Sequence, residues 1–234
     1  MGSAGRAYDE PVPYRGRVHA PSGWAAVVPL KQPASAKQRL VGLDAWRPAL
    51  AVAFATDVVT ALLASQAVQE IVIVGGDGLA PTLLDLPVVH RIADVRGLND
   101  AVEAGMARAH PLTATGVLVL PADLPCLRPA DVDVLLDGAQ THRAQVLADA
   151  DGLGTSALVI PASVTFVPRF GPGSYARHLA AGAMPVEGDL ATARRDVDTV
   201  EHLETARRLG VGLETARLLA QLDADSGALP AVSG

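Results

Sequence analysis

The sequence predicts an α/β fold, in which helices cover both faces of a mostly parallel sheet in one domain of three layers. Short runs rich in Val, Ile and Leu alternate with longer Ala- and Leu-rich stretches that have helical periodicity. Strands that alternate with helices pair in parallel and are buried on both faces, so they appear as continuous apolar runs. The length of 234 residues fits one domain. The second half of the chain is less regular, and there we expect antiparallel or inserted strands.

Each expected strand is a short apolar run bounded by residues that break strands. The run Glu70–Val74 ends at the Gly75–Gly78 turn, and the run Val117–Leu120 lies between Gly116 and Pro121. In chain order, we expect strands at residues 24–30, 70–74, 88–91, 117–120, 144–147 and 155–160, with an edge strand at 185–187.

Helices are expected where the Ala- and Leu-rich stretches begin near Pro or near a capping residue. Pro48 and Pro129 fall in the first turns of two helices, where a missing N–H is tolerated, and Asn99 lies near the N-cap of a third. The expected helices cover residues 47–64, 81–86, 98–110, 129–137, 174–181, 199–209 and 213–222. Leu-Glu-Thr-Ala-Arg occurs at 203–207 and at 213–217, which indicates two helices of similar composition and not a solenoid.

The two ends of the chain differ in composition from the region between them. Residues 1–22 are rich in Gly, Pro, Arg and Tyr without periodicity, so we expect a disordered extension there. Residues 23–222 then form the single domain, and residues 223–234 form a flexible tail.

Composition and charge limit the classes of function. Only 3% of the residues are aromatic, so the core is expected to consist of Ala, Val and Leu. Cys126 is the single cysteine, which excludes an internal disulfide and favours a reducing, cytoplasmic location. The net charge of −6 argues against a general nucleic-acid binder. We expect no membrane span and no secretory signal, because no apolar run approaches roughly 20 residues and the start lacks a signal pattern.

Asp123 is the first candidate functional residue, because it follows the buried run Val117–Leu120 within the sequence Pro-Ala-Asp-Leu-Pro. In open α/β sheets, ligands bind in the crevice outside the carboxyl ends of the strands. A carboxylate at that place is a natural ligand for a hard cation that carries phosphates. The alternative is an ordinary turn residue, since Asp is common in loops after strands.

A basic loop follows the first expected strand, at the same edge of the sheet. Lys31, Lys37 and Arg39 are separated by small residues, which suits a loop that closes over phosphates. The alternative is a solvated charged loop. The loop is not a Walker A motif, and the Gly75–Gly78 turn is too short for a dinucleotide fingerprint.

Several other candidate residues have simpler structural explanations. Glu201 lies three residues after Asp198, a spacing typical of a capping box, so the role of Asp198 could be no more than to cap a helix. Ser174 could likewise be an N-cap. His178 is interpreted as a residue of a helix surface or a substrate loop, because the histidines lack metal-ligand spacing. Cys126 is interpreted as a small packing residue, since no feature marks it as an activated thiolate.

A set of short motifs occurs in a fixed order and carries a resemblance to a known family. The motifs are Val28-Pro-Leu-Lys31, Ala36-Lys37-Gln-Arg39-Leu40, Leu98-Asn99-Asp-Ala, Asp123-Leu-Pro, Gly154-Thr155, Arg169-Phe-Gly171-Pro-Gly-Ser174 with Arg177-His178, and Asp196-Val-Asp198-Thr. Together they resemble the guanylyltransferases of coenzyme F420 biosynthesis, and the similarity covers residues 24–219. Those enzymes join GTP to 2-phospho-L-lactate or, in the actinobacterial branch, to phosphoenolpyruvate. The resemblance implies a single nucleotidyltransferase domain with a Rossmann-like sheet of the glycosyltransferase-A-like type.

The resemblance also implies a role for particular residues. Asp123 and Asp198 match the carboxylates that hold Mg²⁺ at the nucleotide phosphates. The implied catalytic residues are Lys31, Lys37 and Arg39 of the phosphate-binding loop, together with Asp123. The implied nucleotide-binding residues are Pro29, Leu30, Lys31, Gly97, Leu98 and Asn99. The implied acceptor-binding residues are Thr155, Gly171 and Ser174.

The chain departs from the family pattern at two places. Ala122 stands where the family usually has Gly before Asp-Leu-Pro. Gly152-Leu-Gly-Thr155 stands where it often has Gly-Thr-Gly-Thr, which leaves open whether Thr155 or Ser156 contacts the acceptor.

The implied chemistry needs no nucleophilic side chain. A phosphomonoester oxygen, already ionised near neutral pH, attacks the α-phosphorus of a nucleoside triphosphate, and pyrophosphate leaves. Positioning and charge neutralisation then lower the barrier. We expect transfer of GMP from GTP to phosphoenolpyruvate, giving enolpyruvoyl-2-diphospho-5'-guanosine, because the Arg-Phe-Gly-Pro loop and the Ala- and Arg-rich composition look actinobacterial.

The sequence leaves several alternatives to this function open. They are the same reaction on 2-phospho-L-lactate or 3-phosphoglycerate, another nucleotidyltransferase such as one for molybdenum cofactor, and a catalytically silent nucleotide-binding module. A homodimer is left open as the assembly, and the next transferase of the F420 pathway is expected to receive the product.

Overall fold

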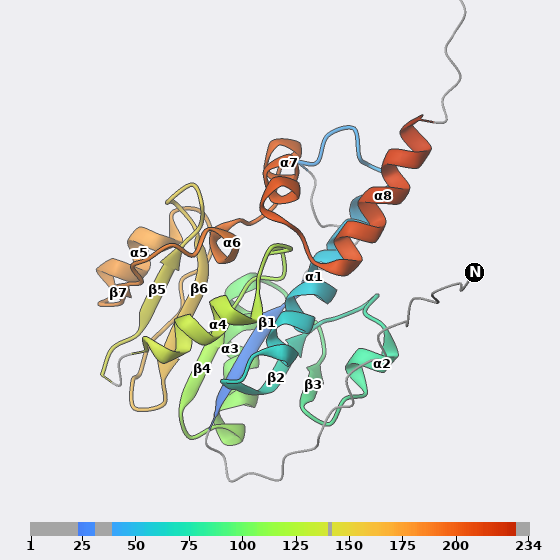
Figure 1. Ribbon diagram of the computed structural model, residues 1–234. Helices are drawn as coiled ribbons and strands as arrows, with labels where there is room; N and C mark the ends of the chain where they lie inside the picture. Colours follow the sequence, from blue (N-terminus) through green and yellow to red (C-terminus); the bar gives the residue numbers. More distant parts are fainter. Residues whose placement is uncertain (1–22, 31–38, 140–141, 228–234) are drawn as a thin grey trace, which may run out of the picture.

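The computed structural model describes residues 23–30, 39–139 and 142–227 (Figure 1). In this part of the chain the strands form one seven-stranded sheet with the order β3-β2-β1-β4-β6-β5-β7. Every neighbouring pair is parallel except the two that involve β6, so β6 alone runs against the other strands. The strands are β1 Trp24–Pro29, β2 Val68–Val74, β3 Val89–Ile92, β4 Gly116–Val119, β5 Gln145–Ala148, β6 Thr155–Pro161 and β7 Met184–Pro185. The mostly parallel α/β sheet is therefore confirmed.

Helices cover both faces of the sheet, which gives the three expected layers (Figure 1). Helices α1 and α4 pack on one face, and α3 and α5 pack on the other. The helices are α1 Arg47–Ala64, α2 Pro81–Leu84, α3 Leu98–Ala109, α4 Pro129–Asp137, α5 Ser174–Ala180, α6 Ala191–Arg194, α7 Val200–Leu209 and α8 Leu213–Gly227, with a 3-10 turn at His110–Leu112.

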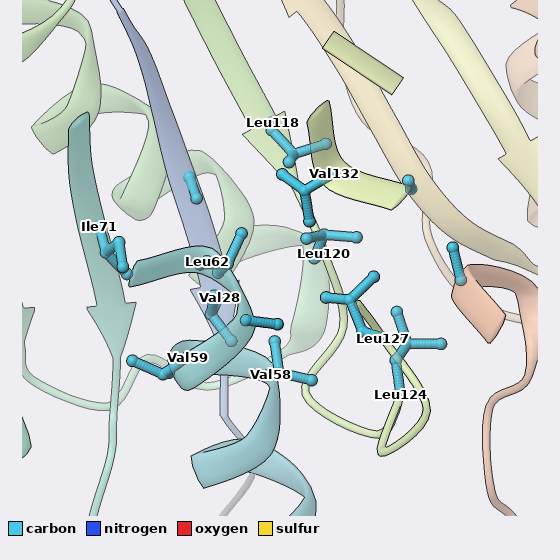
Figure 2. Close-up of a cluster of buried hydrophobic side chains, with 14 of the residues drawn as sticks. Val28, Val58, Val59, Leu62, Ile71, Leu118, Leu120, Leu124, Leu127 and Val132 are labelled. Carbon is cyan, nitrogen blue, oxygen red and sulfur yellow. The ribbon is translucent and has the colours of Figure 1, made fainter. Parts of the chain in front are cut away.

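Strand β1 shows how the apolar sequence builds two cores at once. Successive side chains of a strand point to opposite faces, so Val28 joins the cluster under α1 and α4 while Val27 joins the cluster under α3. Figure 2 shows the first cluster, where Val28 of β1 lies beside Leu62 of α1 and Leu118 of β4 lies beside Val132 of α4. The core consists mainly of Ala, Val and Leu, as the low aromatic content predicts.

Helix α3 comes unusually close to the sheet at Gly105. A Cβ atom added to this residue would overlap with Val27 Cγ1 and lie 3.1 Å from Val74 Cγ2. Glycine therefore allows the helix backbone to approach β1 and β2. The close approach places the start of α3 beside the carboxyl ends of these strands.

Helix α1 is the one helix of the described residues that is long and apolar enough to cross a membrane by length and composition. It packs instead against β2, α4 and α8, and its buried side includes Phe54 and Leu62. Asp57 on its buried side accepts hydrogen bonds from the backbone N–H groups of Glu214 and Thr215, both 3.0 Å. Burial of α1 against these elements therefore explains why the helix is so apolar.

A third apolar cluster lies beyond the carboxyl ends of the strands, on the side of α1 where α7 and α8 lie (Figure 1). It combines residues from four segments, namely Leu40, Leu50, Phe54, Cys126, Val197, Leu203, Ala206 and Leu219. The cluster holds the segments before α1, after β4 and before α7 against one another. These three segments carry Arg39, Asp123 and Asp198.

One expected helix boundary and one missing helix are corrected by the structure. Helix α8 continues to Gly227 instead of ending near Leu222, and Arg207 holds its last turns through Asp223 at 2.7 Å. The short helix α6 was not expected, because four residues are too few to show helical periodicity. Strands β5 and β6 form an antiparallel pair, in agreement with the irregular pattern of the second half.

Candidate active site

The candidate site lies at the carboxyl edge of the sheet, between β1 and β4. The chain leaves β1 toward β2 on one side, while β4 lies on the other, so this is the point where the strand order reverses. Ligands of doubly wound sheets bind at such a point. Hydrogen bonds extend both strands past their ends: Leu30 N–H donates to Val74 O at 2.9 Å and Leu120 N–H donates to Val27 O at 3.0 Å.

Asp123 and Asp198 belong to two segments that lie side by side at this edge. Val197 N–H donates to the carbonyl of Asp123 at 3.0 Å, and both carboxylate residues are partly buried. The chain reaches these positions from different directions, one after β4 and the other before α7. Carboxylates on two neighbouring segments suit a hard divalent cation whose other ligands come from phosphate and water. The described residues contain no cluster of three or more His, Cys, Asp or Glu side chains that could hold a metal by itself.

The capping interpretation of Asp198 is wrong. Thr199 is the N-cap of α7, and its Oγ1 accepts a hydrogen bond from the backbone N–H of His202 at 3.2 Å. Backbone N–H of Asp198 donates to His202 Nδ1 at 3.4 Å. Asp198 therefore lies just outside the helix, and its carboxylate does not cap α7.

The basic loop falls largely outside the described residues. Lys31 and Lys37 lie there, so their positions remain predictions. Arg39 is exposed and directly precedes Leu40, which is fully buried in the cluster that also contains Val197. This places the end of the loop near the Asp198 segment. Pro29 is buried at the end of β1, and Leu30 is half-buried behind it.

The expected nucleotide-binding residues Gly97, Leu98 and Asn99 form the start of α3. Gly97 is the N-cap, with a φ of 97° that favours glycine. Asn99 does not cap the helix. Its side-chain amide forms two hydrogen bonds with the backbone of Phe170. Oδ1 accepts from Phe170 N–H at 2.7 Å, and Nδ2 donates to Phe170 O at 3.2 Å. Asn99 therefore joins the start of α3 to the loop 168–173.

The expected acceptor residues converge at the start of β6. The antiparallel register pairs Val119 with Leu158, so Thr155 lies at the same edge as the segment after β4. Ser174 Oγ and Thr155 Oγ1 are 2.9 Å apart, and both side chains are buried. Ser174 is the first residue of α5 and follows the cap Gly173, so its interpretation as an N-cap is wrong. Ser156 points elsewhere and donates to Arg194 O at 3.2 Å.

The turn before Thr155 is held by one carboxylate. Asp149 accepts hydrogen bonds from the N–H groups of Leu153 at 2.9 Å and Gly154 at 2.6 Å. A Cβ atom on Gly154 would overlap with the Asp149 carboxylate. The turn therefore tolerates Leu153, which is exposed, where the family pattern often has Thr, but needs Gly at position 154.

His178 connects this turn to the loop that contains Gly171. The side chain is fully buried, so its interpretation as a helix-surface residue is wrong. Its Nδ1 is 3.0 Å from Thr155 Oγ1, and its Nε2 accepts from the N–H of Arg169 at 2.8 Å. Burial and, secondarily, the charge of Arg177 lower the pKa of His178 to about 4, so the ring is neutral near pH 7.

Arg177 closes the same loop from outside. Its guanidinium donates to the carbonyls of Arg169, at 3.0 Å from Nη2, and of Pro172. Gly171 lies between these two carbonyls with a φ of 116°, a conformation that favours glycine. The loop thereby keeps its backbone close to Thr155 and Ser174.

Two of these contacts were missed from the sequence. Ser174 and His178 are four residues apart on α5, so their shared direction toward β6 could have been found from helical spacing. The pairing of Asn99 with Phe170 has no such signal, because 71 residues separate them. Cys126 agrees with its expected packing role: it is buried, and burial raises the pKa of its thiol to about 11.

The MobA-like NTP transferase domain family matches residues 55–227. A phosphoenolpyruvate guanylyltransferase of Salinispora arenicola is 41% identical over 201 residues, which cover 83% of this chain and 92% of the relative. A phosphoenolpyruvate guanylyltransferase of Thermomonospora curvata is 41% identical over 209 residues, which cover 87% and 91%. The chain belongs to the phosphoenolpyruvate guanylyltransferase family.

Solved structures agree with this family at the level of the fold. A nucleotide-diphospho-sugar transferase from Desulfovibrio desulfuricans G20 superposes with a TM-score of 0.65 at 21% identity, covering 87% of this chain and 96% of that chain. A 4-diphosphocytidyl-2C-methyl-D-erythritol synthase superposes with a TM-score of 0.53 at 15% identity, covering 80% and 99%. The resemblance drawn from the motifs is confirmed, and the protein is a nucleotidyltransferase of the MobA-like type.

Proposed function

We propose that this guanylyltransferase family member transfers GMP from GTP to phosphoenolpyruvate and releases pyrophosphate. The relatives that are 41% identical over most of the chain carry this activity in their names. The structural observation that supports it most directly is the hydrogen bond between Val197 N–H and Asp123 O. It brings two carboxylate segments together at the sheet edge where Thr155 and Ser174 also lie.

Asp123 and Asp198 would hold Mg²⁺, which supplies charge neutralisation at the nucleotide phosphates. Lys31, Lys37 and Arg39 would bind those phosphates from the loop after β1. The start of α3 at Gly97 and Leu98 would contact the guanosine. Family membership supports these roles, and for Arg39, Gly97, Leu98, Asp123 and Asp198 the position of their segments around the switch point of the sheet supports them as well.

The acceptor would lie against β6 and α5. The hydroxyl groups of Thr155 and Ser174, with the backbone at Gly171, would orient phosphoenolpyruvate so that a phosphate oxygen faces the α-phosphorus of GTP. Positioning of two anions is the main catalytic task, because the attacking oxygen is already ionised. Thr155 is assigned this role in preference to Ser156, whose hydroxyl is engaged with Arg194 O.

The test is a crossed assay of pyrophosphate release. GTP, ATP and CTP are each combined with phosphoenolpyruvate, 2-phospho-L-lactate and 3-phosphoglycerate in the presence of Mg²⁺. Release is expected to be fastest with GTP and phosphoenolpyruvate. A faster reaction with another acceptor would reassign the substrate, and no turnover with any pair would favour a silent nucleotide-binding module. Assays with Mn²⁺ in place of Mg²⁺ test the metal.

Further parts of the proposal concern the setting of the enzyme. A reducing cytoplasm fits Cys126, which is a free buried thiol. The product carries a labile diphosphate bond to GMP, so a second transferase is expected to use it next. Light scattering of the purified chain tests whether the enzyme is a homodimer.

A further inference from the structure

The protonation of the His178 ring is determined by a backbone contact. Nε2 lies 2.8 Å from the backbone N–H of Arg169, and a backbone N–H can only donate. Nε2 is therefore the nitrogen that carries no proton. A neutral ring must then have its proton on Nδ1.

This proton determines the direction of the next hydrogen bond. Nδ1 lies 3.0 Å from Thr155 Oγ1, so the ring donates and the Thr155 hydroxyl oxygen accepts. Thr155 Oγ1 lies in turn 2.9 Å from Ser174 Oγ. The two hydroxyl groups have two protons, and only one of them fits between the two oxygens. The second proton has no acceptor within the trio of His178, Thr155 and Ser174.

We propose that His178 is a positioning residue that makes the Thr155–Ser174 hydroxyl pair an obligatory hydrogen-bond donor to an anionic oxygen of the acceptor. If the ring proton were instead on Nε2, Nδ1 would accept a hydroxyl proton and the pair would offer none. The group that this donor recognises is a carboxylate or phosphate oxygen. The inference rests on the proposed function for the identity of the acceptor, but its hydrogen-bond direction does not.

The surroundings of the ring keep this arrangement neutral and fixed. The ring of Phe170 lies edge-on to His178 with centroids 5.2 Å apart, and the ring of Phe166 is tilted with centroids 5.9 Å apart. Protonation of Nε2 would place two donors against each other at Arg169. The desolvated, neutral ring therefore holds a single tautomer.

Two substitutions separate this role from simple packing. His178→Phe keeps an aromatic ring between Phe166 and Phe170 but removes both nitrogen contacts. His178→Asn keeps an amide donor near the position of Nδ1–H and loses the contact with Arg169. In His178→Phe the second hydroxyl proton is still present but is no longer oriented by Nδ1–H, so we expect the KM for phosphoenolpyruvate to rise about threefold to tenfold, the loss of one neutral hydrogen bond, with the KM for GTP unchanged. His178→Asn should recover part of this loss.

Exposed His110, substituted to Asn, serves as the matched control and should leave both KM values unchanged. A double-mutant cycle of His178→Phe with Thr155→Val should be strongly non-additive, since both changes act on one hydroxyl pair. Equal changes in both KM values, or an unchanged KM for phosphoenolpyruvate in an active His178→Phe enzyme, would overturn the proposal.

Nitrogen NMR of the His178 ring gives a readout that does not depend on turnover. We expect a proton on Nδ1 and none on Nε2. The opposite tautomer would overturn the inference whether or not the enzyme uses phosphoenolpyruvate. If no acceptor in the crossed assay supports turnover, the proposed function fails, and titration of the labelled protein with phosphoenolpyruvate decides the donor role: a shift of the Nδ1 resonance supports it, and no shift overturns it.

Discussion

The pairing of Asn99 with Phe170 leads to a prediction that separates nucleotide binding from acceptor binding. Asn99→Ala removes two hydrogen bonds, of 2.7 and 3.2 Å, and leaves the N–H of the buried residue Phe170 without its acceptor. An unsatisfied buried backbone group costs about 1–3 kcal/mol. This free energy acts on the loop 168–173, which precedes Ser174. We therefore expect the KM for the acceptor to rise about fivefold to a hundredfold, while the KM for GTP changes little.

The assay is steady-state pyrophosphate release with one substrate varied at saturation of the other. Glu103→Gln, an exposed change on the same helix, is the control and should leave both constants unchanged. Chemical denaturation measures whether Asn99→Ala lowers the free energy of unfolding of the whole domain or acts only on the loop 168–173. A rise in the KM for GTP with an unchanged acceptor KM would refute the reasoning and would favour direct contact of Asn99 with the nucleotide.

Three further changes test the metal site, the packing and the buried thiol. Asp123→Asn should lower turnover by at least about a hundredfold with an unchanged circular dichroism spectrum, because the proposed role of this partly buried carboxylate is to hold the metal; wild-type activity would contradict the metal assignment. Gly105→Ala should lower the free energy of unfolding by about 1–3 kcal/mol, because its Cβ overlaps with Val27, and urea denaturation measures this. The pKa of Cys126 is raised from 9.0 to about 11, so the folded state retains the proton that the unfolded state loses. Stability should therefore fall as pH rises from about 9 to about 11, and Cys126→Ala should lack this part of the fall.

Local sequence patterns predicted most of the helices and strands, because the formation of these elements depends on residues that are close in the chain. The apolar run after Gly116 formed β4, and the Pro-initiated stretches formed α1 and α4. The edge position of β7 and the antiparallel direction of β6 followed less directly, since strand order depends on contacts between distant segments. Helix α6 was too short to give a periodic signal.

The choice between neighbouring capping residues shows where local patterns fail. Asp198 and Thr199 are adjacent, and either side chain can accept a hydrogen bond from the first turn of α7. The contact of Val197 with the carbonyl of Asp123 holds the backbone before the helix, and Thr199 then meets His202 N–H. The identity of the cap was thus decided by a strand-end segment more than seventy residues away in the sequence.

By itself, the sequence determined the class of fold and the order of the motifs that place this chain in its family. Those features follow from residue type and from spacing within single elements. The tertiary structure decided which polar groups meet: Asn99 with Phe170, and His178 with Thr155. The physical reason is that a hydrogen-bond partner is selected by packing and burial. Packing and burial bring groups from distant elements into contact, and a local sequence pattern does not indicate which distant element supplies the partner.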